Sequence, residues 1–89
     1  MKPSPQAAVA EAIATVLRDT GRTPGPLEPG MRLAGDVGLD SLDLAQAIVL
    51  LERSLGVDPF RFIDPGTPRP PLRTVSDLVT AYEAALAKP

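Results

Sequence analysis

Cysteine and histidine are both absent from the 89 residues of this sequence. Without thiols the chain cannot form disulfides, iron–sulfur clusters or thiolate zinc sites. Without imidazole it lacks the usual general base and the group that most often activates a serine nucleophile. The only lysines, Lys2 and Lys88, lie near the two ends. We therefore expect no catalytic residues and no metal site, and we do not expect an enzyme.

Aromatic residues, net charge and long apolar runs are also scarce. Aromatics make up 3% of the chain, and much of its 44% hydrophobic content is alanine and leucine, which favours helices over strands. Nine basic against eleven acidic residues argue against nucleic-acid binding. No apolar run is long enough to span a membrane, and the first residues lack the apolar stretch of a secretory signal. We expect one cytoplasmic domain over residues 1–89, with an ordered core over about 5–87.

Prolines and glycines cluster in stretches that separate segments with helical periodicity. A Ser, Asp or Thr precedes each of these segments, and a Gly follows two of them, as at helix ends. They predict three longer helices, over about residues 5–19, 41–55 and 75–87. A short helix is predicted between the last two, over about 58–64, because Asp58 and Pro59 can start it and Pro65 ends it. The predicted fold is an all-α, small four-helix bundle.

Two irregular stretches connect these helices. Residues 21–40 contain three prolines and five glycines, so no helix is expected there. Apolar residues recur along this loop, and we expect some of them to pack onto the core: Leu27, Met31, Leu33, Val37 and Leu39. Residues 64–73 are rich in proline and predict a stiff connector.

Two apolar stripes run along the predicted helix 41–55. The wider stripe is the expected core face and comprises Leu44, Ala47, Ile48, Leu51 and Leu55. The other residues expected in the core are Ile13, Leu17, Leu33, Val37, Val79 and Tyr82. The second stripe, here called the ridge, comprises Leu42, Ala45 and Val49. The ridge is either buried against a second neighbour or exposed for contact with a partner protein, and the flanking Gln46, Glu52 and Arg53 favour exposure.

The segment Gly-Leu-Asp-Ser-Leu-Asp at residues 38–43 stands where the loop meets this helix. Gly38 permits a sharp turn, and Asp40 can cap the helix with Asp43 three residues later. Ser41 then lies in the first turn, where a phosphate on its hydroxyl would meet free backbone amides. No side chain in the sequence is suited to deprotonate this hydroxyl. Ser41 is thus a poor nucleophile but a suitable substrate for another enzyme.

This segment and its surroundings resemble the acyl carrier protein and peptidyl carrier protein superfamily. The motif of that superfamily is Asp-Ser-Leu at the start of the second helix of a four-helix bundle. Residues 33–38 resemble its approach to the motif, residues 51–57 the end of its second helix, and residues 74–78 the start of its last helix. The resemblance covers nearly the whole chain, about residues 5–87.

The resemblance implies that Ser41, flanked by Asp40 and Leu42, receives 4′-phosphopantetheine from coenzyme A. A separate Mg²⁺-dependent phosphopantetheinyl transferase performs this step in the family. The thiol of the arm holds acyl or aminoacyl groups as thioesters, so the implied partners also include a loading ligase or transferase and downstream synthase or tailoring enzymes. We expect a monomer whose partner-binding residues are Leu42, Asp43, Ala45, Gln46, Val49, Glu52 and Arg53. Of these, Asp43 is expected to attract basic partner surfaces.

The charge of the chain indicates which branch of this superfamily it resembles. Fatty-acid carriers are strongly acidic along the second helix, whereas this helix offers only Asp43 and Glu52. The sequence therefore resembles discrete carriers of polyketide, nonribosomal peptide or related specialised pathways. A fatty-acid carrier remains an alternative, as does an unmodified interaction module that uses the ridge. A helix-turn-helix DNA binder is disfavoured because Arg53 is the only basic residue of this helix.

Overall fold

The computed structural model describes residues 3–59 and 72–87, and this part of the chain folds into three helices without a strand. The helices are α1 (Pro5–Asp19), α2 (Ser41–Leu55) and α3 (Val75–Ala87). All three follow the predicted ranges, which confirms the all-helical class. The short helix predicted over 58–64 is not confirmed, because Asp58 and Pro59 are not helical and residues 60–64 lie outside the described residues. Most of the 64–73 connector lies outside them too.

Local signals in the sequence fix both ends of α1. The hydroxyl of Ser4 accepts a hydrogen bond from a first-turn amide 3.2 Å away. At the other end Gly21 has a φ of +79°, in the left-handed region that glycine enters without strain. The amide of Gly21 donates to the carbonyl of Arg18 at 3.1 Å, and the amide of Arg22 donates to that of Leu17 at 2.7 Å. These paired bonds form a Schellman motif, which ends the helix.

Reciprocal capping starts α3. The hydroxyl of Thr74 accepts from the amide of Asp77 at 3.1 Å, and the carboxylate of Asp77 accepts from the amides of Arg73 and Thr74 at 3.0 and 3.1 Å. These amide donors, Arg73 first, hold the pKa of Asp77 below its usual value. Thr74 and Asp77 therefore form a capping box with Asp in place of the usual Glu.

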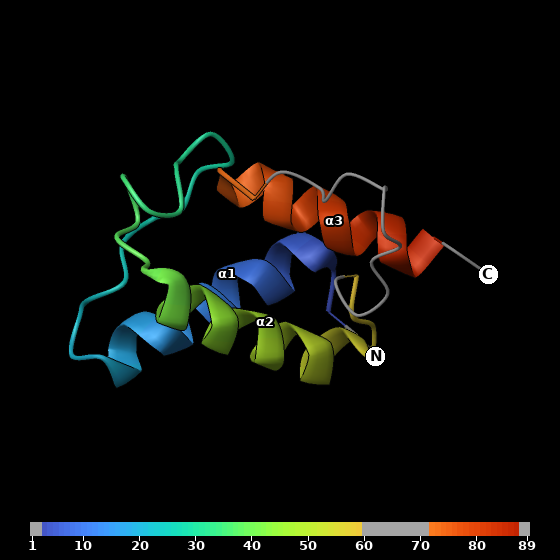
Figure 1. Cartoon of the computed structure of the whole chain (residues 1–89), viewed down its shortest axis with the longest axis horizontal. Helices are drawn as coiled ribbons and strands as arrows, with labels where there is room; N and C mark the ends of the chain where they lie inside the picture. The colour runs from blue at the N-terminus through green and yellow to red at the C-terminus, as the bar shows by residue number, and fades with distance from the viewer. Residues whose placement is uncertain (1–2, 60–71, 88–89) are drawn as a thin grey trace.

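The core forms because α2 and α3 both pack against α1, which lies between them in Figure 1. The fully buried side chains include Ile13 of α1, Leu51 and Leu55 of α2, and Tyr82 of α3. The hydroxyl of Tyr82 reaches α2 and donates to the carbonyl of Ile48 at 3.5 Å. Of the other residues predicted in the core, Leu17 and Leu33 are buried, whereas Val37, Leu44, Ile48 and Val79 are half-buried. None of the described helices is long and apolar enough to cross a membrane.

The loop between α1 and α2 is irregular but attached to the rest of the fold, as predicted. Leu33 and Leu39 are buried, and Leu27, Met31 and Val37 pack partly against the core. Backbone hydrogen bonds also join this loop to the start of α3. The amide of Leu33 donates to the carbonyl of Arg73 at 2.9 Å, and the amide of Val75 donates to that of Met31 at 3.0 Å. The chain therefore arrives at Ser41 from an anchored loop.

Candidate functional site

Ser41 is the first residue of α2 and is exposed to solvent. Asp40 precedes it as the N-cap, and the Oδ1 atom of Asp40 accepts from the amide of Asp43 at 2.8 Å. Within the described residues the amides of Ser41 and Leu42 donate to no acceptor, as expected at the first two positions of a helix. The serine hydroxyl therefore lies beside two free amides at the positive end of α2.

Asp43 completes the capping box but does not lie on the surface. Only 7% of this residue is exposed. Its Oδ2 atom accepts from the amide of Asp40 at 3.2 Å and from Nη2 of Arg22 at 2.7 Å. These donors, Arg22 first, hold the pKa of the Asp43 carboxyl below its usual value. Asp43 is therefore a buried acid whose carboxylate is bound within the fold, and its attraction for basic partner surfaces stays a prediction.

Arg22 is a residue of this site that the sequence analysis did not identify. Its guanidinium bridges three elements: Nε donates to the hydroxyl of Thr20 at 3.0 Å, Nη1 to the carbonyl of Gly38 at 2.5 Å, and Nη2 to Asp43. Arg22 and Asp43 lie 21 residues apart in the chain. A lone arginine within a Pro- and Gly-rich loop carries no spacing signal that would have predicted this contact.

A groove of about 450 Å³ opens directly beside Ser41. Its lining is mostly apolar, comes from the loop, from α2 and from the segment just before α3, and includes two arginines. The lining residues are Arg32, Leu33, Ala34, Gly35, Leu39, Asp40, Ser41, Leu44, Leu72 and Arg73. The site thus combines an exposed hydroxyl, free amides and an adjoining apolar groove.

The ridge on α2 is exposed, which excludes one of the two interpretations left open by the sequence. Leu42 is 67% exposed and Val49 is 48% exposed, and Ala45 between them is exposed as well. The interpretation in which α2 is buried on two sides is therefore wrong. The polar residues predicted to flank the ridge are also exposed, namely Gln46, Glu52 and Arg53.

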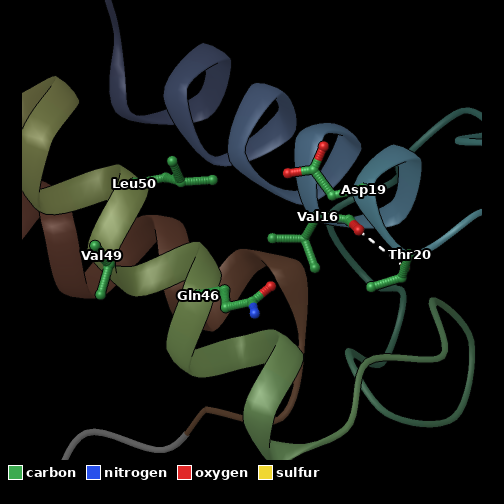
Figure 2. Close-up of a pocket in the computed structure, with 6 residues that line it drawn as sticks. All are labelled: Val16, Asp19, Thr20, Gln46, Val49 and Leu50. Carbon is green, nitrogen blue, oxygen red and sulfur yellow. Dashed lines mark hydrogen bonds between the residues drawn. The ribbon is translucent and has the colours of Figure 1, made fainter.

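A second groove, of about 380 Å³, lies on the surface between α1 and α2 at the edge of the ridge. Figure 2 shows its six lining residues, with those of α1 and its C-cap Thr20 on one side and those of α2 on the other. They are Val16, Asp19, Thr20, Gln46, Val49 and Leu50. The sequence placed Gln46 and Val49 on the partner surface but gave no indication that the end of α1 adjoins them. Among the described residues, no group of three His, Cys, Asp or Glu side chains could hold a metal ion.

A comparison with protein families gives a match to one part of the chain. A family model described as "Phosphopantetheine attachment site" matches residues 7–59, which is more than half of the chain. The matched range includes α1, the loop and α2, with Ser41 inside it. Searches of the curated proteins and of the solved structures found no match.

Proposed function

This chain belongs to the phosphopantetheine-attachment family of carrier proteins, and on that premise we propose that Ser41 is the residue that carries the arm. The family match makes the chain a non-catalytic carrier of the acyl and peptidyl carrier superfamily. Its cofactor is covalent 4′-phosphopantetheine, and it interacts with a phosphopantetheinyl transferase and with partner synthase enzymes. The observation that carries the proposal is the position of Ser41, exposed at the start of α2 within the matched range.

The residues around Ser41 suit a phosphodiester. The amides of Ser41 and Leu42 are free within the described residues, and the helix dipole favours negative charge at this end. The side chain of Asp40 turns toward the amide of Asp43, so its charge is engaged in the cap. The bound arm supplies a thiol that holds acyl or aminoacyl groups as thioesters. The apolar groove beside Ser41 could shelter part of the arm or its cargo.

The proposed partner surface is the ridge with its polar margin. Leu42, Ala45 and Val49 offer exposed apolar contacts, and Gln46, Glu52 and Arg53 border them. A transferase must reach Ser41, so an enzyme that contacts the adjacent Leu42 approaches the serine at the same time. The groove between α1 and α2 extends this surface toward Asp19. Tethering then keeps the cargo at high local concentration near the docked enzyme.

The proposed pathway class is polyketide, nonribosomal peptide or related specialised biosynthesis rather than fatty-acid synthesis. The support is the charge on α2. Because Asp43 is bound to Arg22, the exposed charges of this helix reduce to one acid, Glu52, and one base, Arg53. Partners that recognise a strongly acidic helix would find little charge here. We further propose a monomeric, cytoplasmic carrier domain, since coenzyme A and the transferase must both reach it.

Co-expression with a phosphopantetheinyl transferase tests the function, with intact protein mass as the readout. The mass should increase by one arm, and Ser41→Ala should abolish the increase while the helical circular dichroism stays unchanged. Ser54→Ala is the matched control, because Ser54 is also exposed on α2. Persistence of the mass increase in Ser41→Ala would contradict the assignment. An unmodified wild-type chain that still binds partner proteins through the ridge would favour the interaction module instead.

A further inference from the structure

Both the backbone and the side chain of Arg22 are hydrogen-bonded to the end of α1. Its backbone amide closes the Schellman motif on the carbonyl of Leu17 at 2.7 Å. Its Nε atom then donates to the hydroxyl of Thr20 at 3.0 Å, and Thr20 itself donates to the carbonyl of Val16 at 2.9 Å. The base of the side chain is therefore held by α1. Any group that binds the guanidinium of Arg22 is consequently linked to α1 as well.

The far end of Arg22 holds the chain immediately before Ser41. Its Nη1 atom donates to the carbonyl of Gly38, and its Nη2 atom donates to Asp43 at 2.7 Å. Gly38 has a φ of +86°, so the chain makes its turn toward α2 at the residue whose carbonyl the guanidinium binds. The carboxylate of Asp43 in turn accepts from the amide of Asp40. One planar cation thus grips the chain on both sides of Ser41.

We propose that Arg22 is a positioning residue that holds residues 38–41 in the conformation the transferase recognises, which rests on the proposed function of Ser41. Within the described residues its side chain donates to Thr20, Gly38 and Asp43 and not to the serine hydroxyl, so it acts on Ser41 through Gly38 and Asp43. Loss of the guanidinium frees the Gly38 carbonyl and leaves Asp43 without its cation. The segment before Ser41 then samples other conformations, and only a fraction of the molecules presents the serine correctly.

This mechanism has a kinetic signature that a general loss of stability lacks. If only a fraction of the folded carrier has the conformation that the transferase binds, the apparent affinity of the transferase for the carrier falls in proportion to that fraction. Saturating carrier compensates for the loss, so KM rises while kcat is retained. A lysine retains the positive charge opposite Asp43, but its single ammonium group lacks the planar set of donors with which the guanidinium binds Gly38 and Asp43 together. Arg22→Lys should therefore restore the function only in part.

The test uses the full-length carrier as substrate in steady-state transfer from coenzyme A, with carrier concentration varied. Arg22→Gln should raise the KM for the carrier about tenfold, with kcat within about twofold of wild type. Arg22→Lys should give an intermediate KM. Arg18→Gln is the matched control, because it makes the same charge change near the end of α1 but removes only exposed contacts, chiefly the 3.3 Å ion pair with Glu11. Its KM should equal that of wild type.

Amide hydrogen exchange in the free protein separates positioning from direct contact with the enzyme. Exchange at Asp40, whose amide donates to Asp43, should accelerate more in Arg22→Gln than exchange at the buried Ile13 of α1, which follows global unfolding only. If Arg22 only touched the transferase, exchange in the free protein would stay as in wild type. That result, with or without a raised KM, would overturn the positioning role.

The remaining outcomes also decide the question. A wild-type kcat/KM in Arg22→Gln, or an equal loss in Arg18→Gln, overturns the proposal even when wild type is modified at Ser41. Failure of wild type to accept the arm at Ser41 removes the proposed function itself and is seen before any Arg22 variant is compared. If Arg22→Gln loses its helical signal, Arg22→Lys carries the test. A raised KM with accelerated Asp40 exchange then supports the proposal, and wild-type values overturn it.

Discussion

Leu42 and Leu51 lie nine residues apart on α2 and meet opposite environments, since the first is 67% exposed and the second is fully buried. At 3.6 residues per turn, nine residues bring the helix to about the opposite side. The face that carries Leu51 packs into the core, and the face that carries Leu42 begins beside Ser41. One helix therefore separates the residues needed for folding from those available to partners.

The same substitution at these two leucines should have very different effects on stability. Leu51→Ala removes a fully buried side chain and leaves a cavity, so we expect a loss of about 2–5 kcal/mol in the free energy of unfolding. Leu42→Ala removes an exposed side chain, and its effect should stay within about 0.5 kcal/mol. Chemical denaturation of both variants measures the difference. Equal unfolding midpoints for the two variants would contradict the assigned faces of α2.

Much of this fold could be predicted because its helix boundaries are encoded locally. Ser4, Gly21 and Asp40 each act within a few residues of their own positions, so their types alone indicate where helices begin and end. The side of α2 that faces the core follows from periodicity for the same reason. Residues 60–71, which include most of the predicted short helix, lie outside the described part of the chain.

The contact between Arg22 and Asp43 could not be predicted in this way. It joins residues 21 apart through a loop whose path depends on tertiary packing. From the sequence, Asp43 looks like an acidic first-turn residue exposed at the helix start. The structure shows that the capping position also turns this carboxylate inward, toward α1. The adjoining groove between α1 and α2 depends on the same packing and was missed for the same reason.

Truncation of the ridge should impair loading without affecting folding. Leu42→Ala and Val49→Ala each remove an exposed apolar side chain, and a small interface depends on a few such anchors. We expect at least one of the two to lower kcat/KM for arm transfer or cargo loading by about fivefold or more. Leu86→Ala is the control, because Leu86 is a 38% exposed hydrophobic residue on α3, away from the ridge. Loss of stability without loss of loading would place partner recognition elsewhere.

Charge reversal should distinguish the structural acid of α2 from the exposed one. Asp43→Lys places a second cation against Arg22 and removes the acceptor for the Asp40 amide, so it should lower the unfolding midpoint markedly. Glu52→Lys makes the same charge change at an exposed position and should leave the midpoint nearly unchanged. Comparable midpoints for the two variants would show that Asp43 is not needed in its inward position.

Loading by a partner with a basic surface should respond to Glu52 and to salt. Glu52→Lys removes an attractive charge and adds a repulsive one, which should slow association most at low ionic strength. Loading rates measured across a salt series provide the test. An effect of Glu52→Lys that does not diminish with added salt would exclude long-range attraction as its cause.

Acid should unfold this protein partly through Asp43. Its carboxyl has a usual pKa of 3.8, and the hydrogen bonds from Arg22 and from the Asp40 amide lower that pKa in the folded state. The unfolded chain then binds a proton more readily than the folded one between the two pKa values, so stability falls as the pH falls. The contribution is fully present well above pH 3.8 and is lost as the pH drops through the lowered folded value.

Denaturation curves collected from neutral pH to about pH 2 should show this acid-sensitive region. Asp43→Asn should lower the free energy of unfolding at neutral pH, and that free energy should then fall less steeply with decreasing pH; this fall is called the acid limb. Asp19→Asn removes an exposed carboxylate and should leave the acid limb as in wild type. Asp77, whose pKa the amides of Arg73 and Thr74 lower, supplies the same sign of dependence at α3, so some acid sensitivity should persist in Asp43→Asn. An acid limb in Asp43→Asn as steep as in wild type would show that the ion pair with Arg22 contributes nothing to folding.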